Sequence, residues 1–263
     1  MYIKPRGEIK MIWNAFKIAF SMYSKIPMPK TDWNKKNMKY ALCFFPAVGL
    51  AILALVILWN YISFYLQIGY ILHTSILVVI PVLVTGGIHL DGFLDTMDAL
   101  SSYQPIEKRL EILKDPHTGA FAIISAVTYF ILYFGAWSEV KGEALIILSI
   151  GFVLSRALSG LSVVTFPCAK NSGLAVTFRD AADKNKVKYS MVVYIFICTL
   201  VMLFINVLLG AICVITALIV FIYYKVMSKN NFGGITGDLA GYFLQICELA
   251  MALSIVFIEK IFL

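Results

Sequence analysis

Long apolar stretches dominate the chain and set the fold class before any single residue is considered. An α-helix needs about 20 apolar residues to cross ~30 Å of hydrocarbon. The stretches lack the strict alternation of barrel strands, so helices are the structure they favour. They run from Ala41 to Trp59, Ile71 to Ile88, Ala120 to Trp137, Ala144 to Thr165, Tyr189 to Val207, Leu208 to Met227 and Leu239 to Ile258. We therefore predict an all-α polytopic membrane protein with about seven transmembrane helices.

The segment before the first stretch has a different pattern. From Glu8 to Tyr23 the apolar positions recur at helical spacing, with lysines between them, and the segment ends before Pro27 and Pro29, which cannot continue a helix. This pattern is typical of an amphipathic helix that lies on the membrane surface. The apolar positions are Ile9, Ile12, Trp13, Phe16 and Phe20.

Composition and charge agree with a membrane protein. Apolar residues make up 60% of the chain and charged residues 14%, which excludes a soluble domain, a disulfide scaffold and a nucleic-acid-binding domain. If the seven stretches alternate across the bilayer, one side receives 19 of the 22 lysines and arginines, and the positive-inside rule makes it cytoplasmic. We expect one membrane-embedded catalytic domain, with a cytoplasmic interfacial segment at residues 1–40 and a transmembrane bundle at 41–258.

Three aspartates follow the second stretch at a spacing that suits a metal ion. Asp91, Asp95 and Asp98 stand at i, i+4 and i+7, which places them on one face of a helix. Like charges repel there, and oxygen-only clusters favour hard cations such as Mg²⁺. Nearby Gly86 and Gly87 leave room for the backbone to approach a ligand. The alternative is a solvated acidic helix start.

A second cluster of polar residues follows a short amphipathic helix expected at residues 105–113. Asp115 is a candidate fourth metal carboxylate or general base, and Lys114 a candidate phosphate ligand; both can equally be plain loop charges. His89 and His117 are candidate phosphate or proton partners, although a single histidine is more often structural.

Two further turns have the character of anion sites. Gly234, Thr236, Gly237 and Asp238 precede the last stretch, where a glycine-rich turn leads into a helix N-terminus that attracts phosphate. The alternative is that Asp238 simply caps the helix. The other turn spans residues 167–174, where Lys170 and a following glycine can close over a phosphate.

Two charges lie inside the apolar stretches. Arg156 and Glu248 are each about 14–15 Å from the cytoplasmic end of their helices at ~1.5 Å per residue. A lone charge at that depth is costly. We therefore predict that the two side chains pair or line one polar cavity.

The motifs in their order along the chain resemble those of a known family. SKIPMP and FFPAVG come first, then TGGIHLDGFLDTMDAL, KDPHTGAF and GGITGD with a downstream glutamate. Together they resemble the cobalamin synthase family, the adenosylcobinamide-GDP ribazoletransferases, over nearly the whole chain. The resemblance implies a Mg²⁺-requiring enzyme of the prokaryotic cytoplasmic membrane. Such an enzyme joins adenosylcobinamide-GDP to α-ribazole or its 5′-phosphate and releases GMP.

The resemblance also implies roles for particular residues. Asp91, Asp95 and Asp98 would hold the metal on the diphosphate, and Asp115 or another carboxylate would accept the hydroxyl proton. Asp238 carries over as a site residue, and Arg109, Lys114 and Lys170 are candidates to stabilise the departing GMP. We expect small-molecule substrates and an active site facing the cytoplasm.

Two other functions remain open at this point. A UbiA-type prenyltransferase also holds Mg²⁺-diphosphate on aspartate-rich helices, but it needs two such motifs, and this chain has Gly-Thr-Gly-Asp in the second place. A cation-coupled transporter is the non-enzyme alternative. Transporters usually have repeated halves, and the two halves of this chain are not similar.

Overall fold

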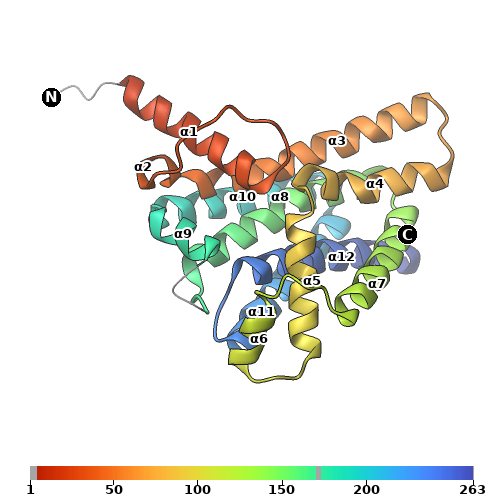
Figure 1. Ribbon diagram of the computed structural model, residues 1–263. Helices are drawn as coiled ribbons and strands as arrows, with labels where there is room; N and C mark the ends of the chain where they lie inside the picture. The colour runs from red at the N-terminus through yellow and green to blue at the C-terminus, as the bar shows by residue number, and fades with distance from the viewer. Residues whose placement is uncertain (1–4, 170–172, 263) are drawn as a thin grey trace.

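A computed structural model describes residues 5–169 and 173–262 of the protein. The chain forms a bundle of helices whose long members run roughly side by side (Figure 1). In chain order they are α1 (Pro5–Tyr23), α2 (Lys35–Met38), the 3-10 turn η1 (Ala41–Phe44), α3 (Phe45–Tyr65), α4 (Tyr70–Thr85), α5 (Ile88–Ser101), α6 (Ile106–Ile112), α7 (Ala120–Glu139), α8 (Gly142–Thr165), α9 (Leu174–Ala181), α10 (Lys184–Ile205), α11 (Val207–Phe232) and α12 (Gly237–Phe262).

The long helices match the expected membrane spans. Within the described residues, six are long and apolar enough to cross a membrane, namely η1 with α3, α7, α8, α10, α11 and α12. Helices α4 and α5 together form a seventh candidate, which is bent by 93°. The prediction of an all-α polytopic protein with about seven spans is therefore confirmed.

The bend between α4 and α5 was not expected. Gly86 (φ 65°) and Gly87 (φ 80°) are both left-handed, a conformation that glycine adopts without a steric penalty. Gly86 ends α4 by donating its N–H to the carbonyl of Leu83 (3.4 Å). These glycines therefore turn the chain, so that α5 runs across the bundle almost at right angles to α4 (Figure 1).

Helix α8 forms the centre of the bundle. It is buried along most of its length, and α3, α10, α11 and α12 pack around it. Large apolar side chains on the outer helices are exposed instead, for example Phe204 on α10 and Ile222 on α11. This arrangement suits a bundle surrounded by lipid, because no hydrophobic force drives those side chains inward there.

The N-terminal helix is amphipathic, as the sequence predicts. On α1, Ile18 and Phe20 are buried, and Phe16 packs edge-on against Phe44 of η1 with ring centroids 5.7 Å apart. On the outer side Ile9, Ile12 and Trp13 are exposed. One face of α1 thus holds it to the bundle, and the start of the helix presents apolar side chains to its surroundings.

The division between the fifth and sixth predicted spans also agrees with the sequence. Helix α10 ends at Ile205 and α11 begins at Val207. Asn206 lies between them, and its side chain caps α11 by accepting a hydrogen bond from the N–H of Leu209 (3.1 Å). The two stretches are separate helices.

Candidate functional site

The site lies where α5 crosses the first turns of α12. The crossing is close because glycines face backbone on both sides. A Cβ on Gly92 of α5 would lie 2.6 Å from the carbonyl oxygen of Asp238, and a Cβ on Gly241 of α12 would lie 2.8 Å from that of His89. This contact brings Asp238 beside the aspartates of α5, which are far from it in sequence.

Four carboxylates gather around this crossing. Asp91, Asp95 and Asp98 all lie on α5, as the spacing predicts. Half-buried Asp95 experiences the like charges of Asp91, Asp98 and Asp238. Such a cluster is destabilising by itself, so its charges favour a bound cation.

Asp98 already has a structural role. Its carboxylate accepts hydrogen bonds from the N–H groups of Gly119 (2.5 Å) and Ala122 (2.9 Å), which begin α7. It therefore satisfies donors that a helix start leaves unpaired, and it holds the loop before α7 against α5. A carboxylate has about four lone-pair sites, so two remain for other partners.

The loop between α6 and α7 holds its predicted site residues on the surface. Asp115 accepts hydrogen bonds from the backbone N–H (2.9 Å) and the Nδ1 (2.7 Å) of His117. These bonds lower the pKa of the Asp115 carboxyl. Lys114 is exposed, as are Asp115 and His117. Since a lowered pKa weakens a base, this environment does not favour Asp115 as the proton acceptor.

The Arg109 side chain hydrogen-bonds to another helix. Its Nη1 donates to the side-chain oxygen of Asn231 on α11 (2.6 Å) and more weakly to the Asn231 carbonyl (3.4 Å). The guanidinium therefore joins α6 to the end of α11. This contact was not anticipated, because 122 residues separate the partners.

The two predicted anion turns meet each other. The Ile235 N–H donates to the Pro167 carbonyl (2.8 Å), and the Ala169 N–H donates to the Ile235 carbonyl (3.0 Å). Gly234 fits against this loop because a Cβ there would lie 2.6 Å from three of its backbone atoms. Lys170, the expected phosphate ligand of this loop, lies outside the described residues.

Thr236, not Asp238, caps α12. The Thr236 hydroxyl accepts a hydrogen bond from the N–H of Leu239 (3.2 Å). Asp238 follows in the first turn, after Gly237 has begun the helix. The alternative reading of Asp238 as a simple N-cap is therefore wrong, because threonine, an equally suitable cap residue, stands two positions earlier.

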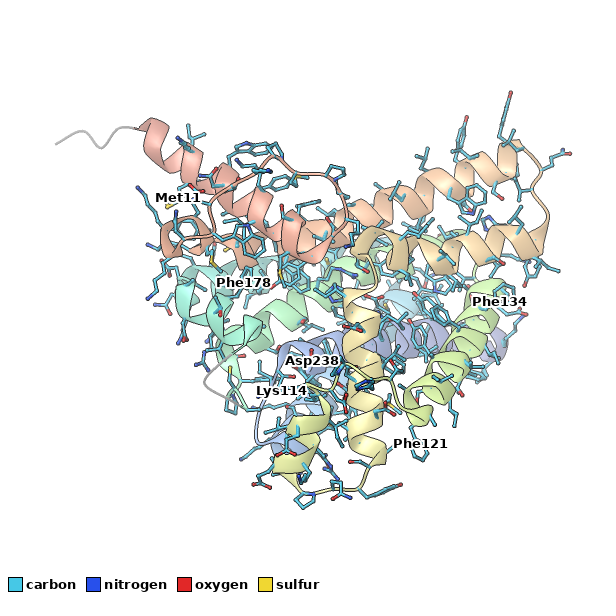
Figure 2. All side chains as sticks on the ribbon, in the orientation of Figure 1. Met11, Lys114, Phe121, Phe134, Phe178 and Asp238 are labelled. Carbon is cyan, nitrogen blue, oxygen red and sulfur yellow. The ribbon has the colours of Figure 1, made fainter. Side chains whose placement is uncertain are left out.

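A cavity of about 290 Å³ adjoins the carboxylates. Asp91 of α5 and Asp238 of α12 both line it, together with His89. The rest of the wall is largely apolar and includes Tyr23 and Phe45. Figure 2 labels Asp238 where α12 begins behind α5. The cavity is at the lower end of the size range of small-molecule sites.

Tyr23 and Phe45 were not among the predicted site residues. A signal for them existed, because Tyr23 directly precedes the SKIPMP motif and Phe45 lies within FFPAVG. Both motifs contribute to the resemblance. Neither ring is charged, however, so the clusters of charged side chains in the sequence did not point to these two residues.

The donor set around the crossing suits Mg²⁺ by its chemistry. Its members are carboxylates from two helices, the hard oxygen ligands that this ion prefers. In the described part of the chain, no three acidic, histidine or cysteine side chains are already close enough together to hold a metal. A bound ion would therefore have to draw the carboxylates together.

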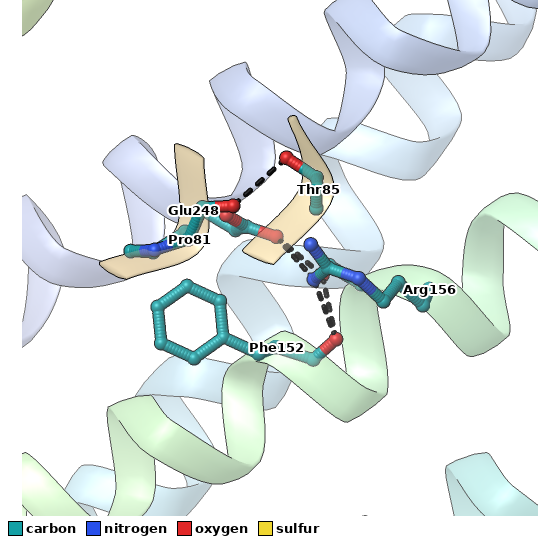
Figure 3. Close-up of polar contacts among 6 residues, drawn as sticks. Pro81, Thr85, Phe152, Arg156 and Glu248 are labelled. Carbon is teal, nitrogen blue, oxygen red and sulfur yellow. Dashed lines mark hydrogen bonds and ion pairs between the residues drawn. The ribbon is translucent and has the colours of Figure 1, made fainter. Parts of the chain in front are cut away.

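Deeper in the bundle, the predicted pair of buried charges is present (Figure 3). The Arg156 Nη1 donates to the Oε1 of Glu248 (2.8 Å) and to the carbonyl of Phe152 (2.9 Å). The Ser155 hydroxyl donates to the same carboxylate oxygen (2.9 Å). Both charged side chains are almost fully buried, so the pairing prediction is confirmed.

Comparison with known proteins gives a family. The sequence profile described as cobalamin-5-phosphate synthase matches residues 15–256. Among curated proteins, the adenosylcobinamide-GDP ribazoletransferase of Lachnoclostridium phytofermentans is 52% identical over 252 residues, which cover 95% of this chain and 97% of that protein.

More distant relatives carry the same name. Those of Clostridium perfringens strain 13 and Fusobacterium nucleatum subsp. nucleatum are 33% and 30% identical. The matches cover 91% and 94% of this chain, and 96% and 99% of the relatives. No solved structure matches the chain significantly.

Proposed function

This chain belongs to the cobalamin-5-phosphate synthase family, and we propose that it is an adenosylcobinamide-GDP ribazoletransferase. It would transfer the phosphocobinamide part of adenosylcobinamide-GDP to α-ribazole or its 5′-phosphate and release GMP. One structural observation carries the proposal: Asp91 and Asp238, which are far apart in sequence, line the same cavity. Neither a prenyltransferase nor a transporter accounts for a family match over nearly the whole chain.

We propose that the carboxylates at the α5–α12 crossing hold Mg²⁺. Asp91, Asp95 and Asp98 are the proposed ligands on α5, and Asp238 of α12 lies beside them outside the ligand set. The repulsion that Asp95 experiences supports this assignment, because a divalent ion would relieve it. When bound, the ion would supply charge neutralisation to the diphosphate oxygens.

The transfer needs a proton acceptor and a leaving group. The α-ribazole hydroxyl attacks the phosphorus on the cobinamide side, a new phosphorus–oxygen bond forms, and the bond to the GMP phosphate oxygen breaks. The hydroxyl proton passes to a carboxylate, for which we propose Asp238, because it lines the cavity whereas Asp115 is engaged with His117. Exposed Lys114 is proposed to attract the leaving GMP. Lys170 stays a second candidate on the sequence alone.

We further propose that the site faces the cytoplasm of a prokaryotic cell. The relatives are bacterial. The α5–α12 crossing lies towards the end of the bundle where α1, α2, α6 and α9 also lie (Figure 1). Together with the start of α10 and the end of α11, these helices carry 13 of the 22 lysines and arginines. The positive-inside rule assigns such an end to the cytoplasm.

A turnover assay tests the proposal. Purified protein in lipid nanodiscs is mixed with adenosylcobinamide-GDP and α-ribazole, and GMP and the corrinoid product are separated by chromatography. We expect equal amounts of both, and loss of turnover after EDTA that added Mg²⁺ restores. Absence of GMP would reject the proposed reaction, and turnover that survives thorough chelation would reject the metal role alone.

A further inference from the structure

The cavity beside the carboxylates has an aromatic wall built from three elements. Tyr23 ends α1, Phe45 begins α3, and His89 lies in the first turn of α5. The ring centroids of Tyr23 and Phe45 are 4.3 Å apart, and that of His89 is 6.4 Å from Tyr23 and 5.8 Å from Phe45. All three residues line the cavity. Such a wall favours a flat aromatic ligand, which can stack on the face of one ring and pack against the edge of another.

The imidazole of His89 has a ring nitrogen without a hydrogen-bond partner. The residue is 94% buried, and its Nε2 is inaccessible to solvent and has no hydrogen-bond partner in the described part of the chain. Buried polar atoms in proteins nearly always have a partner, and a missing one points to a ligand or a water. A neutral imidazole offers one donor and one acceptor nitrogen.

The cavity thus combines three properties. It has aromatic walls, an unsatisfied imidazole and two carboxylates, Asp91 and Asp238. A lipid acyl chain would leave the imidazole without a partner and would make no polar contact with either carboxylate. Water would contact the polar groups but would not use the apolar wall. A heteroaromatic nucleoside matches all three properties, because its base is flat and partly polar while its sugar bears hydroxyls.

We propose that this cavity is the binding site of the acceptor nucleoside, with the heteroaromatic base against Tyr23, Phe45 and His89 and the sugar towards Asp91 and Asp238. The inference rests on the proposed function, in which α-ribazole, a benzimidazole nucleoside, is the acceptor. A rotation of the His89 ring would turn its Nε2 towards the bound nucleoside. The corrinoid substrate approaches the carboxylates from outside this cavity.

Kinetics with both substrates varied separately test the assignment. In His89→Ala and Phe45→Leu we expect the KM for α-ribazole to rise about tenfold, equivalent to about 1.4 kcal/mol. The KM for adenosylcobinamide-GDP should stay within about twofold, a change below 0.5 kcal/mol. Val163→Phe gives an independent test, because it adds volume to a residue of the cavity wall and should raise the same KM without removing a polar group. Equilibrium dialysis measures α-ribazole binding in all variants without turnover.

Matched controls come from outside the cavity. His73→Ala removes a histidine near the start of α4, far along the helix from the bend that leads to His89. Phe130→Leu removes a partly buried aromatic ring from α7. Neither residue lines the cavity. Both controls should keep the wild-type KM for α-ribazole, and size-exclusion chromatography verifies that each variant is folded.

The outcomes separate the two proposals. If folded His89→Ala and Val163→Phe bind α-ribazole as tightly as the wild type, the site assignment is overturned. The proposed function still stands in that case, provided that the wild type turns over. The assignment is also overturned if these variants raise the KM for adenosylcobinamide-GDP and not the KM for α-ribazole. A wild type that binds α-ribazole at this cavity but never releases GMP supports the site and rejects the proposed reaction.

Discussion

At the scale of single residues, the four aspartates near the α5–α12 crossing have different surroundings. Asp98 is tied to the start of α7 by two backbone hydrogen bonds, whereas Asp91 and Asp238 line the cavity. Asp95 lies among the other three charges. Their contributions to catalysis and to folding are therefore separable by substitution.

Asp95→Asn should abolish turnover and preserve the fold. The amide keeps the size of the side chain, removes one negative charge from a crowded cluster and weakens a hard-cation site. We expect at least about a 10²-fold fall in GMP release, as is typical when transition-state charge stabilisation is lost. Thermal unfolding should show equal or greater stability.

The control is Glu107→Gln, which removes a charge of the same sign from the exposed face of α6. It should leave turnover unchanged. Retained activity in Asp95→Asn would contradict the proposed metal role.

The Arg156–Glu248 pair predicts non-additive stability. Arg156→Met leaves the Glu248 carboxylate buried without its cation, and Glu248→Gln leaves the guanidinium without its anion. Each should cost about 3–5 kcal/mol. The double variant should cost clearly less than the sum, because no unpaired charge remains. Thermal denaturation of the detergent-solubilised variants measures these differences, and additive losses would show that the pair does not act as a unit.

At the scale of elements, the α5–α12 contact depends on the absence of a side chain at Gly92. Gly92→Ala would place a methyl group 2.6 Å from the Asp238 carbonyl oxygen and 2.8 Å from its Cα. Backbone cannot yield as a flexible side chain can, so α5 should move away from α12. We expect losses of both turnover and thermal stability.

Gly135→Ala is the matched control on α7. No atom lies within 4 Å of a Cβ at that position. Since alanine is the better helix former, this variant should be more stable by about 0.5–1 kcal/mol and fully active. A Gly92→Ala protein that behaves in the same way would show that the close crossing is not required.

The sequence predicts the elements better than their contacts. The length of the apolar stretches identified the spans, and helical spacing identified the surface helix and the face shared by Asp91, Asp95 and Asp98. It did not reveal the turn at Gly86 and Gly87, because a left-handed backbone leaves no periodic signal. The sequence pattern also did not predict that Asp238 lies close to α5, because that contact arises from tertiary packing at Gly92.

At the scale of the whole molecule, the alternation of the spans predicts which loops face which side. We expect Gln104→Cys, in the exposed loop after α5, to react with a membrane-impermeant thiol reagent only after cells are opened. Lys141→Cys, between α7 and α8, should react in intact cells. Gel-shift of the labelled protein measures both.

The unsubstituted protein is the background control for this labelling. Its five cysteines are buried or partly buried, so it should label weakly. The reverse pattern for the two introduced cysteines would place the carboxylates on the outer side of the membrane and contradict the proposed orientation.

The early end of α4 has a consequence for the surrounding lipid. Its 16 residues cover only about 24 Å at ~1.5 Å per residue, less than the ~30 Å hydrocarbon thickness of a typical bilayer. A bilayer that thins next to α4 would match this length, and the headgroup layer would then lie closer to the aspartates. Reconstitution in lipids of increasing acyl-chain length would make that deformation more costly, so the enzyme should work best in thin membranes.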